Sequence, residues 1–138
     1  MVLTARSKIE MGAGALNGDL GILLSGYMKS RIDHCVTGAL VWAGERVFEV
    51  LEGDAAALLT LRATVSGDDR LADVECLEYV ALTSRKYSNW VVATPPQCHP
   101  YVTGYSCADL TAGAVRRFVA DIVGPGTLAA SPPLVAAA

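Results

Sequence analysis

The sequence predicts an α+β fold in which two helices are inserted between the strands of one sheet. Some short segments alternate apolar and polar residues with a period of two, as strands do, and others repeat apolar residues at helical spacing. These segments follow one another in the order βαββαββ. That order favours an antiparallel-rich sheet with both helices on one face, the ferredoxin-like plan. A chain of 138 residues is long enough to bury one such core.

The elements of the first half follow from periodicity and turn residues. Residues 2–6 are predicted as a short strand, and a glycine-rich stretch separates them from a helix that begins near Asn17, a residue suited to cap a helix N-terminus. The apolar residues on one face of this helix are Leu20, Leu23, Leu24 and Tyr27. A hairpin follows, with strands at residues 37–42 and 46–52 joined by a turn at residues 43–44.

The second half continues the same alternation. Asp54 is placed to cap a second helix that ends at residues 67–69. Its predicted buried residues are Leu58, Leu61 and Val65. A fourth strand is predicted at residues 74–82 and a short fifth strand at residues 89–92, before two prolines that stop it.

A third helix is predicted after the last strand, with Asp109 as its cap. Its apolar stripe is Val115, Phe118, Val119, Ile122 and Val123. We expect this helix to cover the second face of the sheet, although the same stripe could instead contact a partner chain. The chain then divides into a domain at residues 1–94, an extension with the helix at residues 95–124, and a Pro/Ala-rich flexible tail at residues 125–138.

One carboxylate stands out in the second strand of the hairpin. Side chains alternate between the two faces of a strand, so Glu49 shares its face with Val47 and Leu51. Burying an unpaired carboxylate costs several kcal/mol, roughly. Glu49 is therefore expected to be paired, protonated or close to a polar ligand, unless it lies at a hydrated edge of the sheet.

Composition argues against several classes of partner and location. The net charge is −3 and the 11 basic residues form no Lys/Arg run, so we expect neither a nucleic acid nor a membrane as partner. The sequence shows neither a signal peptide nor an apolar stretch of membrane-spanning length, which predicts a cytoplasmic protein. The four cysteines lack C-x-x-C spacing and are most simply free thiols.

Motifs for metal binding or catalysis are weak. The pairs His34-Cys35 and Cys98-His99 offer two thiols and two imidazoles, but they are far apart in the sequence. We find no nucleophile elbow, phosphate-binding loop or dinucleotide fingerprint. The sequence therefore predicts no metal site and no enzymatic activity.

Three runs of sequence carry a resemblance to a known family. VTGALVWAGERVFEVLEG, GDDRLADVECL and SRKYSNWVV resemble the BLUF family of flavin-based blue-light sensors in T-G, L-E-G, D-x-R and a late Trp. The resemblance covers about residues 2–93. It implies a ferredoxin-like domain that holds the ring of FAD between its two helices and passes a light signal from the sheet to a partner or output segment.

The chain departs from this family pattern at the photochemical positions. The family's Tyr aligns with Ala5, its switching Gln with Glu49, and the Asn that holds the edge of the flavin ring with Arg31. An amide both donates and accepts hydrogen bonds, whereas a carboxylate only accepts, so the family's Tyr-Gln-flavin relay cannot be built here. Asp68 and Arg70 are retained, as candidate flavin contacts or as an ion pair at a helix end.

These substitutions favour a light-insensitive sensory or regulatory module that acts through protein-protein contacts, with FAD absent or weakly bound. Its expected partner is a regulatory protein, and a homo-oligomer is plausible. Phe48, Val50 and the third helix are the candidate contact surface. The alternative is an FAD-binding photoreceptor with altered photochemistry.

Two of the substitutions suggest a specific contact. If Arg31 and Glu49 both face the place of the flavin, they can pair across it and offset each other's desolvation. Alternatively, Arg31 is solvated at the C-terminus of the first helix, where a cation is favourable in any case.

Overall fold

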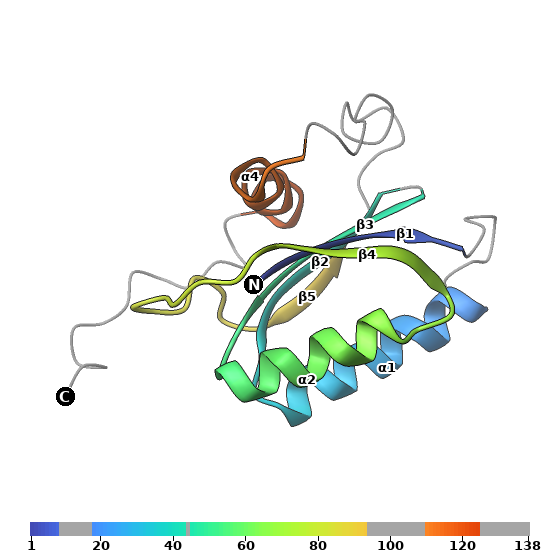
Figure 1. Cartoon of the computed structure of the whole chain (residues 1–138), viewed down its shortest axis with the longest axis horizontal. Helices are drawn as coiled ribbons and strands as arrows, with labels where there is room; N and C mark the ends of the chain where they lie inside the picture. The colour runs from blue at the N-terminus through green and yellow to red at the C-terminus, as the bar shows by residue number, and fades with distance from the viewer. Residues whose placement is uncertain (9–17, 44, 94–109, 125–138) are drawn as a thin grey trace.

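The protein forms three layers, a helix pair, a sheet and a single helix, in a computed structural model that describes residues 1–8, 18–43, 45–93 and 110–124. The elements are β1 (Val2–Ser7), α1 (Asp19–Asp33), β2 (Thr37–Ala43), β3 (Arg46–Glu52), α2 (Ala55–Ser66), β4 (Leu71–Glu78), β5 (Trp90–Ala93) and α4 (Ala112–Val123). Helices α1 and α2 lie together on one face of the sheet and α4 lies on the other (Figure 1). The predicted α+β, ferredoxin-like plan is confirmed.

The sheet has the strand order β4-β1-β3-β2-β5. Strand β3 lies between β1 and β2 and is antiparallel to both, so the crossover through α1 skips one strand. Strand β5 is parallel to β2 at one edge. This register places Glu49 at the centre of the sheet, opposite Leu3 of β1 and Leu40 of β2.

The larger core lies between the sheet and the helix pair. Val47 and Leu51 of β3 point into it, as the predicted alternation requires. The predicted faces of the helices supply the other side, and their buried residues are Leu23, Leu24, Tyr27, Leu58, Leu61 and Val65. Glu49 is on the same face, and its side chain therefore enters this core rather than solvent.

The second core lies under α4. Phe48 and Phe118 meet edge to face, with ring centroids 5.3 Å apart and an interplanar angle of 86°. Val50 is buried beside them, with Val119 of the helix. Helix α4 thus covers its own sheet, and the prediction that Phe48, Val50 and this helix form an exposed contact surface is wrong, because these side chains fill a core.

Several predicted boundaries shift. Strand β4 starts three residues earlier than predicted, at Leu71, and ends at Glu78, because the chain beyond Glu78 runs past the start of β1 and loses its pairing partner. Helix α4 is capped by Thr111, whose side chain accepts a hydrogen bond from the backbone N–H of Ala114. The predicted caps Asn17 and Asp109 and the predicted tail at residues 125–138 lie outside the described residues.

Candidate functional site

The centre of the site is an ion pair between Arg31 and Glu49. Arg31 lies in the last turn of α1 and reaches down to the sheet. Its Nε donates to Glu49 Oε2 at 3.0 Å and its NH2 donates to Glu49 Oε1 at 2.8 Å, a bidentate geometry. The Arg31 side chain is 0% exposed and that of Glu49 is 3% exposed. The predicted pairing is confirmed, and the alternative of a solvated Arg31 is wrong.

Trp90 supplies a third donor to the same carboxylate. Its indole Nε1 donates to Glu49 Oε2 at 2.8 Å, from β5 at the edge of the sheet. The sequence analysis used this Trp only as part of the family resemblance, and so missed its polar contact. The sequence offered only a general indication of this contact, namely that a buried indole N–H usually has a hydrogen-bond acceptor.

Aromatic rings cover the arginine. The guanidinium carbon of Arg31 lies 4.4 Å from the centroid of the Tyr27 ring and 5.7 Å from that of the Trp90 ring. Both distances are within the range of attraction between a cation and an aromatic face. Arg31 NH1 also donates to the hydroxyl of Ser30 at 3.1 Å. The cation is therefore held by hydrogen bonds, by a carboxylate and by two rings, all supplied by the protein.

A second polar cluster adjoins the first through Tyr27. The Tyr27 hydroxyl donates to Asp68 Oδ2 at 2.8 Å, which joins α1 to the turn between α2 and β4. Arg70 donates to the same carboxylate through its backbone N–H, its Nε and its NH2, each at 2.9 Å. The retained D-x-R residues thus form an ion pair with each other.

These contacts shift two pKa values in opposite directions. The hydrogen bonds from the Arg70 side chain are the main cause that lowers the pKa of Asp68 to about 2. Burial first, and then the hydrogen bond to Asp68, raise the pKa of the Tyr27 phenol. Asp68 is ionised and Tyr27 is protonated at neutral pH, so the direction of the Tyr27–Asp68 hydrogen bond is fixed.

Ala5 lies on the same face of the sheet, in β1, and is buried. It pairs with Val47, which pairs in turn with Trp42 of β2, so these three side chains form one row across the sheet. At Ala5 this row therefore carries only a methyl group. Trp42 is fully buried at the other end of the row, and its indole N–H has no hydrogen-bond partner among the described residues.

Two other retained positions serve the scaffold. Gly38 has φ +144°, and a Cβ there would lie 1.8 Å from the carbonyl oxygen of Val50, so only glycine fits between β2 and β3. Glu52 is buried and accepts hydrogen bonds from the backbone N–H groups of Lys86 (2.8 and 3.0 Å) and Tyr87 (2.8 Å). Sequence reasoning did not find this role of the L-E-G glutamate, which fixes the connection from β4 to β5.

Within the described ranges, no group of three or more His, Cys, Asp or Glu side chains could hold a metal ion. Cys98 and His99 lie outside those ranges. In the same part of the chain, no helix has the length and apolar character needed to cross a membrane.

The chain matches one protein-family model and several solved structures. The family model BLUF, "Sensors of blue-light using FAD", matches residues 10–93. Among solved structures, BlsA in its photo-activated state is similar with a TM-score of 0.74 and 13% identity, over 94% of this chain and 96% of that one. A bacterial light-regulated adenylyl cyclase is similar with a TM-score of 0.58 and 19% identity, over 67% of this chain and 27% of that one.

A third similar structure is Klebsiella pneumoniae BlrP1 with FMN and cyclic diGMP, with a TM-score of 0.57 and 22% identity, over 67% of this chain and 24% of that one. This chain thus spans about a quarter of the length of BlrP1 and of the cyclase. No curated protein matches it.

The chain folds as one five-stranded sheet with paired helices over one face, and a family model of sensory domains matches residues 10–93. This fold and this match define the class of the protein, a small sensory domain. The chain belongs to the BLUF family, whose members bind FAD and sense blue light.

Proposed function

We propose that this chain is a light-insensitive regulatory module of the BLUF family that acts through contacts with another protein. The observation that carries the proposal is the closed network of Arg31, Glu49 and Trp90, in which each polar group already has a protein partner. Arg31 and Glu49 stand at the two positions where the family resemblance places the residues that contact the edge of the flavin ring.

The residues present do not fit a flavin at this place. A flavin edge needs donors for its carbonyl groups and an acceptor for its ring N–H. Here the Nε and NH2 of Arg31 face Glu49, and neither side chain has more than 3% of its surface exposed. Separating a buried ion pair costs on the order of 3–5 kcal/mol, which a ring would have to offset before it gained any affinity.

The photochemical groups are also replaced. Ala5 cannot donate an electron or a proton, and the side chain of Glu49 has no N–H to exchange in a hydrogen-bond switch. The nearby phenol, Tyr27, lies on α1 and donates to Asp68, which holds it away from the row of Ala5. A protein with these substitutions keeps the scaffold of the family and loses its light reaction.

Protein contact is the remaining mode of action, and we propose a regulatory protein as the partner and no enzymatic activity for the module itself. The similarity to light-regulated signalling proteins supports this, because BLUF domains there occupy a minor part of a longer chain. The family thus works by influencing another domain or protein.

The test is an absorption spectrum of purified protein expressed with added FAD, recorded before and after blue illumination. We expect no bound flavin in the unmodified chain. The matched variant R31N/E49Q restores the family's two amides and should retain flavin through gel filtration, and adding Ala5→Tyr should introduce a light-induced red shift.

One result would contradict the proposal, and a second would contradict the account of the site on which it rests. A flavin band in the unmodified chain that shifts to the red under blue light would establish the alternative, an FAD-binding photoreceptor with altered photochemistry. A flavin band without a shift would leave the module light-insensitive but would overturn the account of the closed site.

A further inference from the structure

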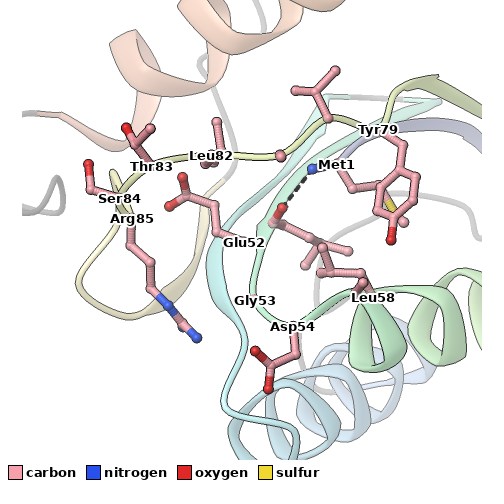
Figure 2. Close-up of a pocket in the computed structure, with 14 residues that line it drawn as sticks. Met1, Glu52, Gly53, Asp54, Leu58, Tyr79, Leu82, Thr83, Ser84 and Arg85 are labelled. Carbon is pink, nitrogen blue, oxygen red and sulfur yellow. Dashed lines mark hydrogen bonds between the residues drawn. The ribbon is translucent and has the colours of Figure 1, made fainter.

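A hollow of about 620 Å³ lies between the end of β3 and residues 79–85 (Figure 2). Two of its charged side chains, Glu52 and Arg85, already have protein partners. Glu52 accepts from backbone N–H groups, and Arg85 NH1 donates to a backbone carbonyl. A smaller hollow of about 70 Å³ lies near the end of β1, and one residue of its lining has a buried polar group without a partner within the described ranges. We call this smaller hollow the Thr4 cavity, after that residue.

The hydroxyl of Thr4 is the group without a partner. Thr4 is 6% exposed, and no described residue forms a hydrogen bond with its Oγ1. Thr4 lies opposite Phe48 of β3 and Glu75 of β4, so its side chain is on the face of the sheet that α4 covers, where it lines the cavity. A buried hydroxyl costs free energy unless it is hydrogen-bonded. A molecule in the cavity would supply the missing partner.

A β-bulge lies beside Thr4. In the pairing of β1 with β4, residues 73–74 oppose the single residue Ala5. Asp73 has φ 53°, a left-handed conformation that is uncommon for residues other than glycine. The bulge places Asp73 Oδ2 at 3.3 Å from Nε of Arg6, and both residues line the cavity. Bulges of this kind are frequent next to active sites, where they redirect a side chain.

The charged residues of the Thr4 cavity are arranged with one sign on each side. Arg6 of β1 and Arg46 of β3 are directly opposite each other, and Asp73 and Glu75 both lie on the outer strand β4. Like charges at directly opposite positions destabilise a sheet, and an anion between the two arginines would offset that effect. A guanidinium has several N–H donors, so one that already has a protein partner can still donate to a ligand.

A small zwitterion matches this arrangement. We infer that the Thr4 cavity binds a small α-amino acid, of the size of glycine or alanine. Its carboxylate accepts from the hydroxyl of Thr4 and from the guanidinium groups of Arg6 and Arg46, and its ammonium donates to Glu75. A volume of about 70 Å³ limits the ligand to a few non-hydrogen atoms, since one water molecule takes about 30 Å³ in the liquid.

This site is separate from the Arg31–Glu49 pair. Thr4 is on the face of the sheet that α4 covers, whereas Glu49 is on the face of the helix pair. Leu110, just before α4, also lines the cavity, so a bound amino acid contacts both the sheet and the start of this helix. The inference goes beyond the proposed function and does not depend on it.

Titration of the full chain with glycine, followed by amide NMR shifts, tests the inference. We expect saturable shifts at residues 4–6 and 73–75, with a Kd in the millimolar range because so small a ligand makes few contacts. Thr4→Val should weaken binding by about tenfold or more, because the carboxylate loses a donor. This variant should fold as well as wild type, since it removes a buried hydroxyl without a partner. The matched control is Thr60→Val on α2, whose hydroxyl donates to the carbonyl of Ala56 within its own helix, and it should bind glycine like wild type.

Acetate tests whether both charges of the ligand are recognised. It should bind more weakly than glycine, and Glu75→Gln should weaken the binding of glycine while leaving that of acetate unchanged. Acetate that binds as tightly as glycine would overturn the assignment to a zwitterion. The absence of saturable shifts with tens of millimolar glycine, or a clear loss of stability in Thr4→Val, would overturn the site itself. None of these outcomes depends on flavin or on a protein partner.

Discussion

Strand β3 carries two buried glutamates that are held in different ways. Glu49 faces the helix pair, and its partners are the side chains of Arg31 and Trp90. Glu52 lies three positions further on, and its partners are the backbone N–H groups of Lys86 and Tyr87. Both carboxylates are almost fully inaccessible to water, yet one depends on two particular residues elsewhere in the chain and the other does not.

The difference lies in what each carboxylate depends on. Any residue except proline offers a backbone N–H. The hydrogen bonds of Glu52 therefore do not depend on which side chains stand at residues 86 and 87, between β4 and β5. Glu49 is tolerable only because Arg31 supplies a cation in the same core. Arg31 and Glu49 thus depend on each other, and the predictions below test that dependence.

The largest effect should come from Arg31→Met. This change keeps most of the unbranched apolar stem of the side chain but leaves the Glu49 carboxylate buried without a cation. We expect the free energy of unfolding at pH 7 to fall by about 3–5 kcal/mol, as is typical when one partner of a buried pair is removed. Urea unfolding followed by circular dichroism measures it.

Lys29→Met is the matched control, because Lys29 lies on the same helix and pairs with Asp33 at the surface. An exposed pair of this kind contributes little to stability, because water and salt screen it. Equal losses in the two variants would show that the Arg31–Glu49 pair has no special energetic role.

Glu52→Gln should have the next largest effect. With its oxygen at the place of Oε1 the amide still accepts from Lys86 and Tyr87, but its NH₂ group then takes the place of Oε2 and opposes the backbone N–H of Lys86, donor against donor. We expect a loss of about 1–3 kcal/mol. Amide exchange should accelerate first at residues 86–87, whereas Glu75→Gln on the exposed face of β4 should change neither quantity.

Much of the fold could be predicted from the sequence because its signals are local. The period-two runs of β2 and β3 and the apolar faces of α1 and α2 each follow from neighbouring residues. The end of β4 could not be predicted in this way. The apolar residues continue to Leu82, but the strand ends at Glu78, which forms the last pair with β1. The end of this strand is therefore set by its pairing partner and not by its own composition.

The candidate site could also be predicted only in part from the sequence. The misplaced charge of Glu49 was visible as a break in an apolar row, and the substitution at Arg31 suggested its partner. The contribution of Trp90 depends on β5 lying beside β2, and that of Tyr27 on the position of the turn with Asp68. Such contacts join segments far apart in the sequence, so only the tertiary structure reveals them.

A smaller effect is expected from Asp68→Asn, and it should depend on pH. The pKa of Asp68 is lowered from 3.8 to about 2 in the folded protein, so its ionisation stabilises the fold above pH 4. This contribution should be lost as the pH falls from about 4 to about 2. The unfolding free energies of wild type and variant should therefore differ at pH 7 and converge near pH 2.

Asp73→Asn is the control, because Asp73 forms an exposed pair with Arg6 and has φ 53°, which Asn tolerates well. Acid titrations of the unfolding midpoint compare the three proteins. Parallel curves for wild type and Asp68→Asn would mean that the Arg70 contacts do not stabilise the ionised form.

The smallest effect should come from removing the whole network at once, with R31M/E49L/W90F. Replacing every partner by an apolar residue of similar size leaves no buried polar group without a partner, and such exchanges are often neutral or stabilising. We expect the unfolding free energy to lie within about 1 kcal/mol of wild type, well above that of Arg31→Met alone. A triple variant as unstable as the single one would indicate that the loss comes from packing of the Arg31 stem rather than from the stranded charge. A near-neutral result would show that Arg31 and Glu49 depend on each other, whereas the fold requires neither of them. The Arg31–Glu49 pair would then differ from Glu52, whose partners are backbone N–H groups of the connection between β4 and β5.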